Sequence, residues 1–263
     1  MLTITKLRGA EYLISSVAKG MEDYYMGAGE APGVWQGGWA ESLGLEGVVH
    51  AAELRALVDG LDPRSGEDLL AGLRERKVRA IDVTLSVPKS VSLLWAFGTP
   101  ETTATVSIAV VEATAEAVGF LEERAAFARQ QSGGVRRRVA TGGFAVATFA
   151  HRTSRDGDPQ LHTHCLIPNV VQRADGQHVA FDAAPLHVWG KAAGTVFLKL
   201  ARAPVDAEAG GGVGTRTERV AGARRVHPRA VAGVLETDRR HRDPPRSQRR
   251  GRVLFEGGAD AGR

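Results

Sequence analysis

The stretch His151-Arg-Thr-Ser-Arg-Asp-Gly-Asp-Pro-Gln-Leu-His-Thr-His164 decides how this chain folds. Its centre, residues 154–159, is rich in the residue types that form tight turns. The pattern predicts a strand from about 141 to 151, a turn, and an antiparallel strand from about 162 to 173. Side chains two apart on a strand share a face, so His162 and His164 should project together. The turn can then bring His151 beside them.

Three imidazoles that converge in this way can bind a divalent metal ion and leave coordination positions open for a substrate. Imidazole favours Zn, Ni, Cu or Fe, but a phosphate oxygen in the coordination shell would also make Mn or Mg workable. The other interpretation is that the rings only form hydrogen bonds on a sheet face. The intervening Thr163 and the apolar Leu161, Cys165 and Ile167 should face the other way, towards helices. We therefore expect Cys165 to be a core residue and not a ligand.

Apolar periodicity and turn residues divide the rest of the chain. Further strands are predicted at 2–5, 78–87 and 178–182, and helices at 11–25, 51–58, 102–131 and 186–203. Gly133 and Gly134 should end the helix at 102–131, and Pro88-Lys89-Ser90 should end the strand at 78–87. Long helices mixed with hairpin-joined strands predict an α+β domain with a central antiparallel sheet flanked by helices.

Composition excludes several classes of protein. The chain has 263 residues, of which 43% are hydrophobic and 24% are charged, which is enough to build a core and too apolar for global disorder. It contains no run of about 18 uncharged apolar residues, and its start lacks the apolar core of a signal peptide, so we expect neither membrane insertion nor secretion. Its single cysteine, Cys165, cannot close an intrachain disulfide, which favours the cytoplasm.

The chain changes character after about residue 203. From Pro204 onward it has 13 Arg, no Lys and 8 acidic residues, with much Gly, Ala and Val and no sustained apolar period. We expect a domain at 1–203 and an unpacked tail at 204–263. The tail is either a disordered basic arm for nucleic-acid phosphates or an out-of-frame translation of GC-rich DNA, in which case the domain is incomplete.

Two further features carry chemistry. The only three tyrosines, Tyr12, Tyr24 and Tyr25, lie in the first 25 residues, which points to a role for the phenols, although each could be an ordinary half-buried aromatic. Asp82 interrupts a β-rich apolar segment, where a carboxylate is costly unless it is paired. A metal-bound histidine would be a suitable partner; the alternative is the exposed face of an edge strand.

Basic and aromatic side chains near these motifs are candidates for contacts with DNA. The basic candidates are Lys89, Arg136, Arg137, Arg138, Arg152 and Arg155. Trp35 and Trp39, in a glycine-rich loop, could stack on bases. The alternatives are that the three-arginine run is a solvated turn and that the tryptophans pin their loop to the core.

Three motifs together resemble a known family, the MobF-class conjugative relaxases. Asp82-Val-Thr-Leu-Ser-Val-Pro-Lys-Ser-Val-Ser-Leu-Leu-Trp95 is similar to the family signature Asp-Leu-Thr-Phe-Ser-Ala-Pro-Lys-Ser-Val-Ser. The segment 151–164 resembles its three-histidine segment. Glu22-Asp-Tyr-Tyr25, followed by Trp35-Gln-Gly-Gly-Trp-Ala-Glu-Ser-Leu-Gly-Leu45, resembles its N-terminal tyrosine region. The resemblance covers about 1–203 and fails in the tail.

The resemblance implies an HUH-type endonuclease fold and a metal-dependent enzyme that nicks and rejoins single-stranded DNA at an origin of transfer. His151, His162 and His164 would be the ligands of a divalent ion such as Mg, Mn or Zn. Asp82 would orient a ligand histidine or assist deprotonation of a tyrosine, and the nucleophile would come from Tyr12, Tyr24 and Tyr25. The family often has two paired-tyrosine sites, but the first pair here reads Tyr12-Leu13, which leaves open which tyrosine cuts first.

Attack by a tyrosine would leave a 5′-phosphotyrosyl link, which a second hydroxyl can reverse. We expect a cytoplasmic monomer that works with other conjugation proteins. Two alternatives remain at this stage. The chain could be an inactive remnant, truncated or frame-shifted, that at most binds DNA, or it could be a metal-dependent hydrolytic phosphodiesterase that makes no use of tyrosine.

Overall fold

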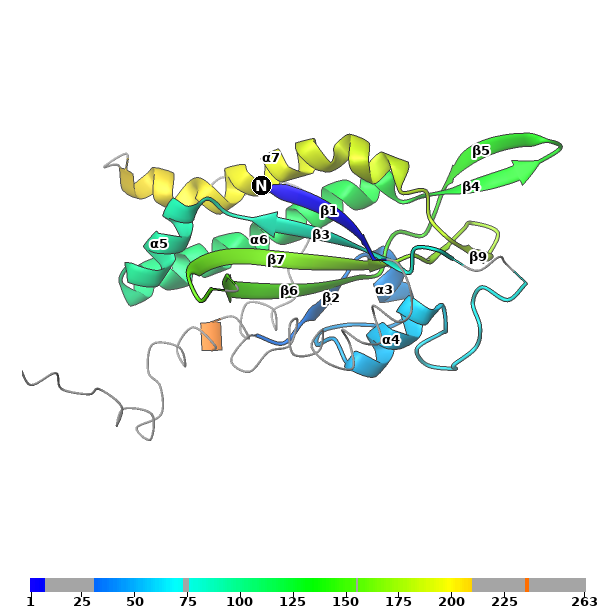
Figure 1. The fold of residues 1–263 in the computed structure, drawn as a ribbon, viewed down its shortest axis with the longest axis horizontal. Coiled ribbons are helices and arrows are strands. Elements are labelled where there is room, and N and C mark those ends of the chain that lie inside the picture. The colour runs from blue at the N-terminus through cyan, green and yellow to red at the C-terminus, as the bar shows by residue number, and fades with distance from the viewer. Residues whose placement is uncertain (8–30, 73–75, 155, 210–234, 237–263) are drawn as a thin grey trace, which may run out of the picture.

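A five-stranded antiparallel sheet organises the molecule in the computed structural model, which describes residues 1–7, 31–72, 76–154, 156–209 and 235–236 (Figure 1). Its strands, in spatial order, are β1 (Leu2–Leu7), β3 (Ala80–Ser86), β7 (Pro159–Pro168), β6 (Val146–Thr153) and β2 (Val34–Gln36). The two strands that carry the histidines, β6 and β7, therefore lie inside the sheet and not at its edges. This confirms the expected α+β class with a central antiparallel sheet.

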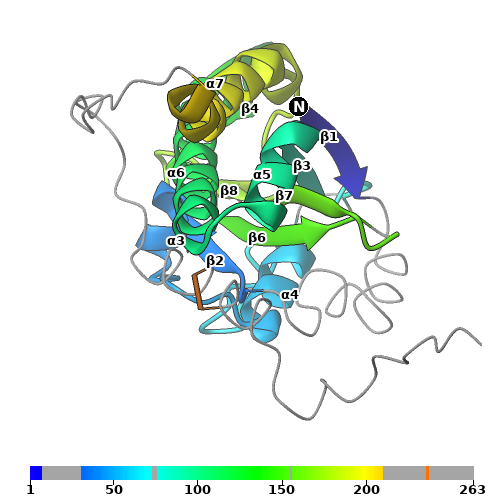
Figure 2. The same ribbon diagram turned by 90° about the vertical axis from the view of Figure 1, so that its left-hand side faces the viewer.

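Helices cover both faces of this sheet (Figure 2). One face packs against α5 (Lys89–Phe97), α6 (Pro100–Ala125) and α7 (Ala184–Ala209), and the other lies over α3 (Gly38–Ser42) and α4 (Ala51–Asp59). Alternation along the strands explains this division, because successive side chains supply two separate cores. Cys165 and Ile167 of β7 join the core under α6, as predicted, while Phe149 and Leu166 join the core on the other face.

Helix α6 is long and strongly apolar. Its length and hydropathy would allow it to cross a membrane, but 61% of its most apolar 18-residue window is buried inside the molecule. Val106, Ala113, Ala117 and Leu121 are each at most 3% exposed. The helix is therefore accounted for as a core helix between the sheet and α7.

The predicted helix at 102–131 was wrong at its C-terminal end. The helix ends at Ala125, and the chain continues as a hairpin made of β4 (Phe127–Ser132) and β5 (Val135–Ala140). Gly133 and Gly134, with φ of 57° and 78°, form the two-residue turn that such hairpins favour. Phe127 happens to continue the apolar period of the helix, so periodicity alone could not detect the change. Arg136, Arg137 and Arg138 lie within β5, so the run is part of a strand and not a turn.

Other element boundaries also differ. The strand predicted from 141 begins at Val146, and the strand predicted to reach 173 ends at Pro168, after which β8 (Val171–Gln172) pairs with β9 (His178–Val179). Helix α5 was missed because Pro88 was interpreted only as the end of a strand, whereas it serves as the N-cap. Helix α7 runs past residue 203 and includes Pro204. The predicted helix at 11–25 lies outside the described residues.

Candidate metal centre

Three histidine side chains meet on the face of the sheet that lies away from α6. The ring centroids of His151, His162 and His164 are 5.1 Å apart for every pair. One ligand nitrogen from each ring lies within 4.8 Å of the other two. The rings form a nearly equilateral triangle, which is the arrangement that the sequence predicted.

Strand register explains why these three rings meet. His151 of β6 lies directly opposite His162 of β7, and Phe149 lies opposite His164, so all four side chains share one face. The pairing becomes irregular between His151 and Thr153, just before the turn that leads back into β7. Irregular pairing of this kind is common beside functional sites, where it adjusts the direction of a side chain.

A buried carboxylate fixes the ring of His164. Asp82 of β3 is 6% exposed, and its Oδ2 accepts a hydrogen bond of 2.8 Å from His164 Nδ1. Thr84 Oγ1 lies 3.3 Å from the same nitrogen. Since β3 lies between β1 and β7, the alternative of an exposed edge-strand carboxylate is wrong. With Nδ1 held in this way, Nε2 of His164 carries the lone pair that can bind a metal.

A backbone acceptor fixes the ring of His162. Its Nδ1 donates to the carbonyl oxygen of Gln160 at 2.9 Å, which again leaves Nε2 as the nitrogen with a free lone pair. Burial lowers the pKa of His162 below the ordinary histidine value, even though the bond to Gln160 acts in the opposite direction. The neutral imidazole, which is the form that binds metals, is thereby favoured at neutral pH.

These residues fit a divalent metal ion. Two nitrogens bound at about 2.1 Å to one tetrahedral ion lie roughly 3.4 Å apart, so the observed spacing needs only a small closure of the rings. The donor set also fits, since two of the three rings have Nδ1 oriented by an acceptor, as metal-binding histidines usually do. Three protein ligands leave open positions, which is typical of a catalytic site and not of a structural one.

The predicted DNA-contact residues differ in their positions. Lys89 begins α5, and its Nζ donates to the carbonyl oxygen of Pro159 at 3.0 Å and lies 3.7 Å from the carboxylate of Asp158. Its side chain is 48% exposed. Arg152 is 5% exposed and lines a small cavity together with Trp95, His151 and His162. The contact of Arg152 with a phosphate stays a prediction. Arg155 lies outside the described residues.

The tryptophans pin their segment to the core, which was the alternative to base stacking. Trp35 and Trp39 are 4% and 1% exposed, and Trp35 Nε1 donates to Glu53 at 3.1 Å. Their ring faces are therefore covered. Tyr12, Tyr24 and Tyr25 lie outside the described residues, so the structure does not place the predicted nucleophile.

Sequence reasoning missed two residues that support the histidines. Thr84, which contacts His164, could have been found because it lies two positions after Asp82 and so on the same face. Ser92 of α5 is buried, and its Oγ accepts the backbone N–H of Leu161, which fixes the start of β7 next to His162. Nothing in the local pattern points to Ser92, because the contact joins a helix that was not predicted.

Comparison with known proteins gives matches over most of the chain. A family model described as TrwC relaxase matches residues 6–247. The multifunctional conjugation protein TraI of Escherichia coli (strain K12) is 35% identical over 156 residues, which are 57% of this chain and 8% of that protein. The chain thus spans only a small part of the length of this curated relative.

Solved structures match as well. The conjugative relaxase TrwC in complex with oriT DNA, in a metal-free structure, has a TM-score of 0.66 and 30% identity, covering 78% of this chain and 69% of that chain. A copper-bound structure of TrwC with oriT DNA has a TM-score of 0.65 and 33% identity, covering 78% and 70%. The expected relaxase fold is confirmed by these matches. Since the family model spans most of the chain, the protein belongs to the TrwC relaxase family.

Proposed function

We propose that this chain is a metal-dependent relaxase, which cuts single-stranded DNA at an origin of transfer by transesterification through a tyrosine and can rejoin it. The observation that carries this proposal is the triangle of His151, His162 and His164 with Asp82 behind it. The TrwC relaxase match over 6–247 and the structures of TrwC with oriT DNA support it. TrwC has also been solved in a metal-bound form, which supports a divalent cofactor for this chain; the identity of the ion stays open.

Different side chains would hold the metal ion, orient its ligands and attack the phosphate. His151, His162 and His164 would hold the ion, and Asp82 keeps the ring of His164 in the tautomer that presents Nε2. A bound divalent ion would draw charge from a non-bridging phosphate oxygen and so stabilise the extra negative charge of the transition state. A tyrosine oxygen forms a bond to phosphorus while the bond from phosphorus to the 3′ oxygen breaks, and the 3′-hydroxyl leaves. Because the phosphodiester character is kept, the step is reversible.

Chain length allows the predicted nucleophiles to reach this site. The described chain resumes at Ala31, three residues before Val34 of β2, which pairs with Thr148 of β6, three residues before His151. The six-residue step from Tyr25 to Ala31 spans at most about 20 Å. Tyr24 needs only one residue more. Covalent geometry therefore supports a nucleophile from this pair, and Tyr12 remains the alternative.

Phosphate contacts are proposed for exposed basic side chains. Arg136 and Arg137 of β5 are exposed, and Lys89 has half of its side chain in solvent. Arg155 remains a predicted contact. Together these groups supply the salt-dependent part of DNA affinity, whereas the histidine triangle supplies the chemistry.

The test uses labelled single-stranded oligonucleotides that tile the DNA flanking the gene of this chain, incubated with the full chain and Mn²⁺. We expect one oligonucleotide to give a protein–DNA adduct that survives denaturing electrophoresis. Chelation of the metal should abolish the adduct. Of the three variants Tyr12→Phe, Tyr24→Phe and Tyr25→Phe, the one that no longer forms the adduct identifies the first nucleophile. His187→Ala, an exposed histidine of α7, serves as the control and should leave the adduct unchanged.

The alternatives give different products. Free cut fragments without an adduct would support a hydrolytic phosphodiesterase, because water would then replace the tyrosine. Neither fragments nor adduct from any oligonucleotide, with DNA binding retained, would support an inactive remnant. Either result contradicts the transesterase.

The cellular setting follows from the same proposal. The buried position of the apolar helix α6 agrees with the expectation of no membrane insertion, and we propose a cytoplasmic monomer that acts with other conjugation proteins. The boundary at 203 stays a prediction: α7 continues to Ala209 and the family match to 247. Reading the gene in all frames after codon 203 tests whether the tail belongs to the domain.

A further inference from the structure

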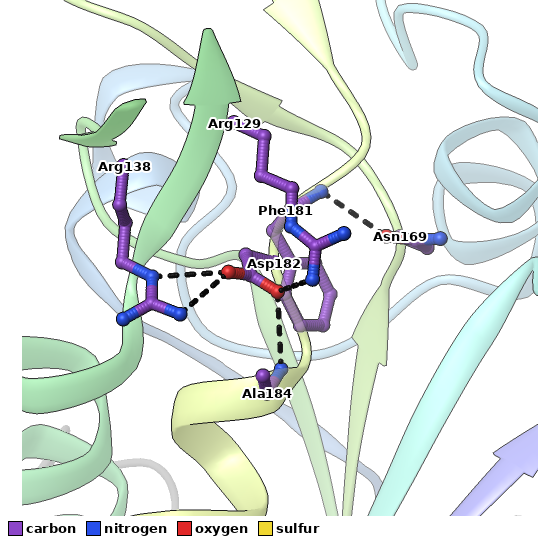
Figure 3. Close-up of polar contacts among 6 residues, drawn as sticks. All are labelled: Arg129, Arg138, Asn169, Phe181, Asp182 and Ala184. Carbon is purple, nitrogen blue, oxygen red and sulfur yellow. Dashed lines mark hydrogen bonds and ion pairs between the residues drawn. The ribbon is translucent and has the colours of Figure 1, made fainter. Parts of the chain in front are cut away.

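One buried carboxylate outside the metal centre gathers two arginines. Asp182, just before α7, has a side chain only 2% exposed, yet Arg129 and Arg138, which contact it, are 54% and 50% exposed. Figure 3 shows both guanidinium groups pointing at this carboxylate from the β4–β5 hairpin. The hairpin itself extends away from the rest of the molecule (Figure 1).

Both oxygens of the Asp182 carboxylate accept hydrogen bonds. Oδ1 accepts from Arg129 Nη2 at 2.7 Å and from the backbone N–H of Ala184 at 3.2 Å. Oδ2 accepts from Arg138 Nε at 3.0 Å and Nη2 at 2.9 Å. Burial alone would raise the pKa of Asp182, but the hydrogen bonds from the two arginines outweigh it and hold the pKa below the ordinary value. The side chain is therefore a charged junction between the hairpin and the first turn of α7.

Register shows what this junction does for the hairpin. Arg129 and Arg138 are directly opposite each other across the two strands, and like charges in that position repel. Asp182 contacts both guanidinium groups, so its negative charge attracts each arginine and offsets the repulsion between them. The backbone adds a bond from the N–H of Asp182 to the carbonyl oxygen of Phe127 at 2.7 Å, so the base of the hairpin is held on the same side.

The outer part of the hairpin carries two more arginines. Arg136 shares a face with Arg138, and Arg137 points to the other face, because side chains alternate along β5. Both are exposed, and their charge is not neutralised by Asp182. The junction therefore divides the four arginines into an inner pair that fixes the hairpin and an outer pair that remains available to an anion.

We propose that Asp182 is a positioning residue for DNA binding: it fixes the β4–β5 hairpin through Arg129 and Arg138 so that Arg136 and Arg137 meet DNA phosphates. This inference rests on the proposed function for its ligand. It assigns no part in strand cleavage to Asp182, because the hairpin joins the sheet at the start of β6 whereas the metal centre lies near the end of that strand.

The direction in which Asp182→Asn changes DNA affinity distinguishes a positioning role of Asp182 from a purely electrostatic one. Asp182→Asn removes a negative charge, so a purely electrostatic role predicts equal or tighter DNA binding. Positioning predicts weaker binding, about threefold to tenfold, because the outer arginines lose their fixed direction. Asp175→Asn is the matched control, since Asp175 pairs with Arg173 in the β8–β9 turn and carries the same charge; we expect less than a twofold change.

The experiment measures affinity for a labelled single-stranded oligonucleotide by fluorescence anisotropy at several salt concentrations, using the full chain. Arg136→Gln combined with Arg137→Gln should weaken binding and lower the salt slope by about 1.4, the value for two contacts with a single strand. Arg138→Lys keeps the charge but loses the two-donor contact, so it should weaken binding in the same direction as Asp182→Asn. This variant decides the matter if Asp182→Asn does not fold.

Kinetics distinguish positioning from general damage. In the nicking assay, Asp182→Asn should raise the KM for the oligonucleotide and leave kcat within about twofold, whereas partial unfolding would lower kcat. Unchanged or tighter DNA binding by both Asp182→Asn and Arg138→Lys overturns the inference, even if nicking proceeds normally. If the unmodified chain does not nick DNA, the proposed function is contradicted. The comparison of DNA affinities between the unmodified chain and the variants still tests the role of Asp182.

Discussion

At the scale of single residues, His162 and His164 differ in the partner that orients each ring. His164 donates to the Asp82 carboxylate, whereas His162 donates to a neutral backbone carbonyl. An anionic partner raises the basicity of an imidazole ligand more than a neutral one does. The two histidines are therefore not equivalent ligands, although the sequence presents them as a symmetric pair.

Asp82→Asn tests this difference. The asparagine keeps the shape of the side chain but removes its charge, so metal affinity should fall by about 10-fold to 100-fold. Calorimetric titration with Mn²⁺ measures it. Thr84→Val, which removes the longer contact of 3.3 Å to the same nitrogen, should change affinity much less. Affinity in Asp82→Asn within twofold of the unmodified chain would contradict this role of the carboxylate.

His162→Ala separates cleavage from binding. We expect it to abolish nicking, because in the proposed mechanism one ion serves the reaction and this ring would be one of its three ligands. DNA affinity should stay within roughly an order of magnitude, since it rests on many phosphate contacts. Parallel nicking and anisotropy measurements check both parts, with His187→Ala as the control. Equal loss of cleavage and binding would contradict the division of roles.

The histidine triangle and the role of Asp82 as a carboxylate partner for one of its rings were predicted from sequence, whereas the supports from Thr84 and Ser92 were not. Spacing of two residues on a strand and a turn of ordinary length sufficed to bring His151, His162 and His164 together. The contact between Asp82 and His164 depends on the register of β3 against β7, strands about 80 residues apart. A residue pattern can show that Asp82 needs a partner but not which side chain lies opposite it.

At the scale of elements, a buried carboxylate of α6 joins this helix to α3 and to the segment that leads into β6. Glu122 is 6% exposed, and its Oε1 accepts backbone N–H groups from Gly38 of α3 and from Phe144 just before β6, both at 2.8 Å. Both N–H groups would otherwise lose their partner inside the protein. This carboxylate therefore joins three elements that are distant in sequence.

Glu122→Ala should lower the free energy of unfolding by about 2 to 4 kcal/mol, because the buried N–H of Phe144 and the part-buried N–H of Gly38 lose their acceptor. Urea denaturation followed by circular dichroism measures the change. Glu112→Ala makes the same substitution at an exposed position of the same helix and should cost less than about 0.5 kcal/mol. Similar losses of stability in the two variants would show that replacing any glutamate of α6 has this effect. The loss would then not come from the hydrogen bonds that Glu122 accepts from Gly38 and Phe144.

The junction of the hairpin with α7 predicts a dependence of stability on pH. The pKa of folded Asp182 lies below its unfolded value of about 3.9. Its contribution is therefore fully present above about pH 4 and is lost as the pH falls through the folded pKa. The charged groups that contact it are Arg129 and Arg138, and arginine side chains in general stay protonated at acidic pH. The stability difference between the unmodified chain and Asp182→Asn should be constant from pH 7 to 5 and shrink below pH 4. A difference that is unchanged at pH 3 would contradict this.

Element boundaries show where periodicity is insufficient. The β4–β5 hairpin was merged into a helix because Phe127 kept the helical period, although the two glycines at its turn were recognised as a break. Only pairing between the two halves of 127–140 reveals the strands, and that pairing is absent from a one-dimensional pattern. By contrast, the strand–turn–strand unit of β6 and β7 was predicted, because turn residues mark its centre.

At the scale of the whole molecule, the fold brings together residues that are otherwise independent. The histidine triangle takes one ring from β6 and two from β7, and its supports come from β3 and α5. An unfolded chain does not hold these groups at one point. A metal ion that binds this triangle therefore binds the folded state in preference to the unfolded one.

Metal binding should consequently stabilise the entire chain. At a free concentration about 100 times its Kd, an ion adds about 2.7 kcal/mol to the free energy of unfolding, which for a chain of this size raises Tm by roughly 5 to 10 °C. Thermal unfolding with Mn²⁺, compared with the same protein in chelator, measures the shift without any requirement for activity. His162→Ala should lose it and His187→Ala should keep it. An equal shift in His162→Ala would place the ion elsewhere, because only binding that uses the triangle depends on that ring.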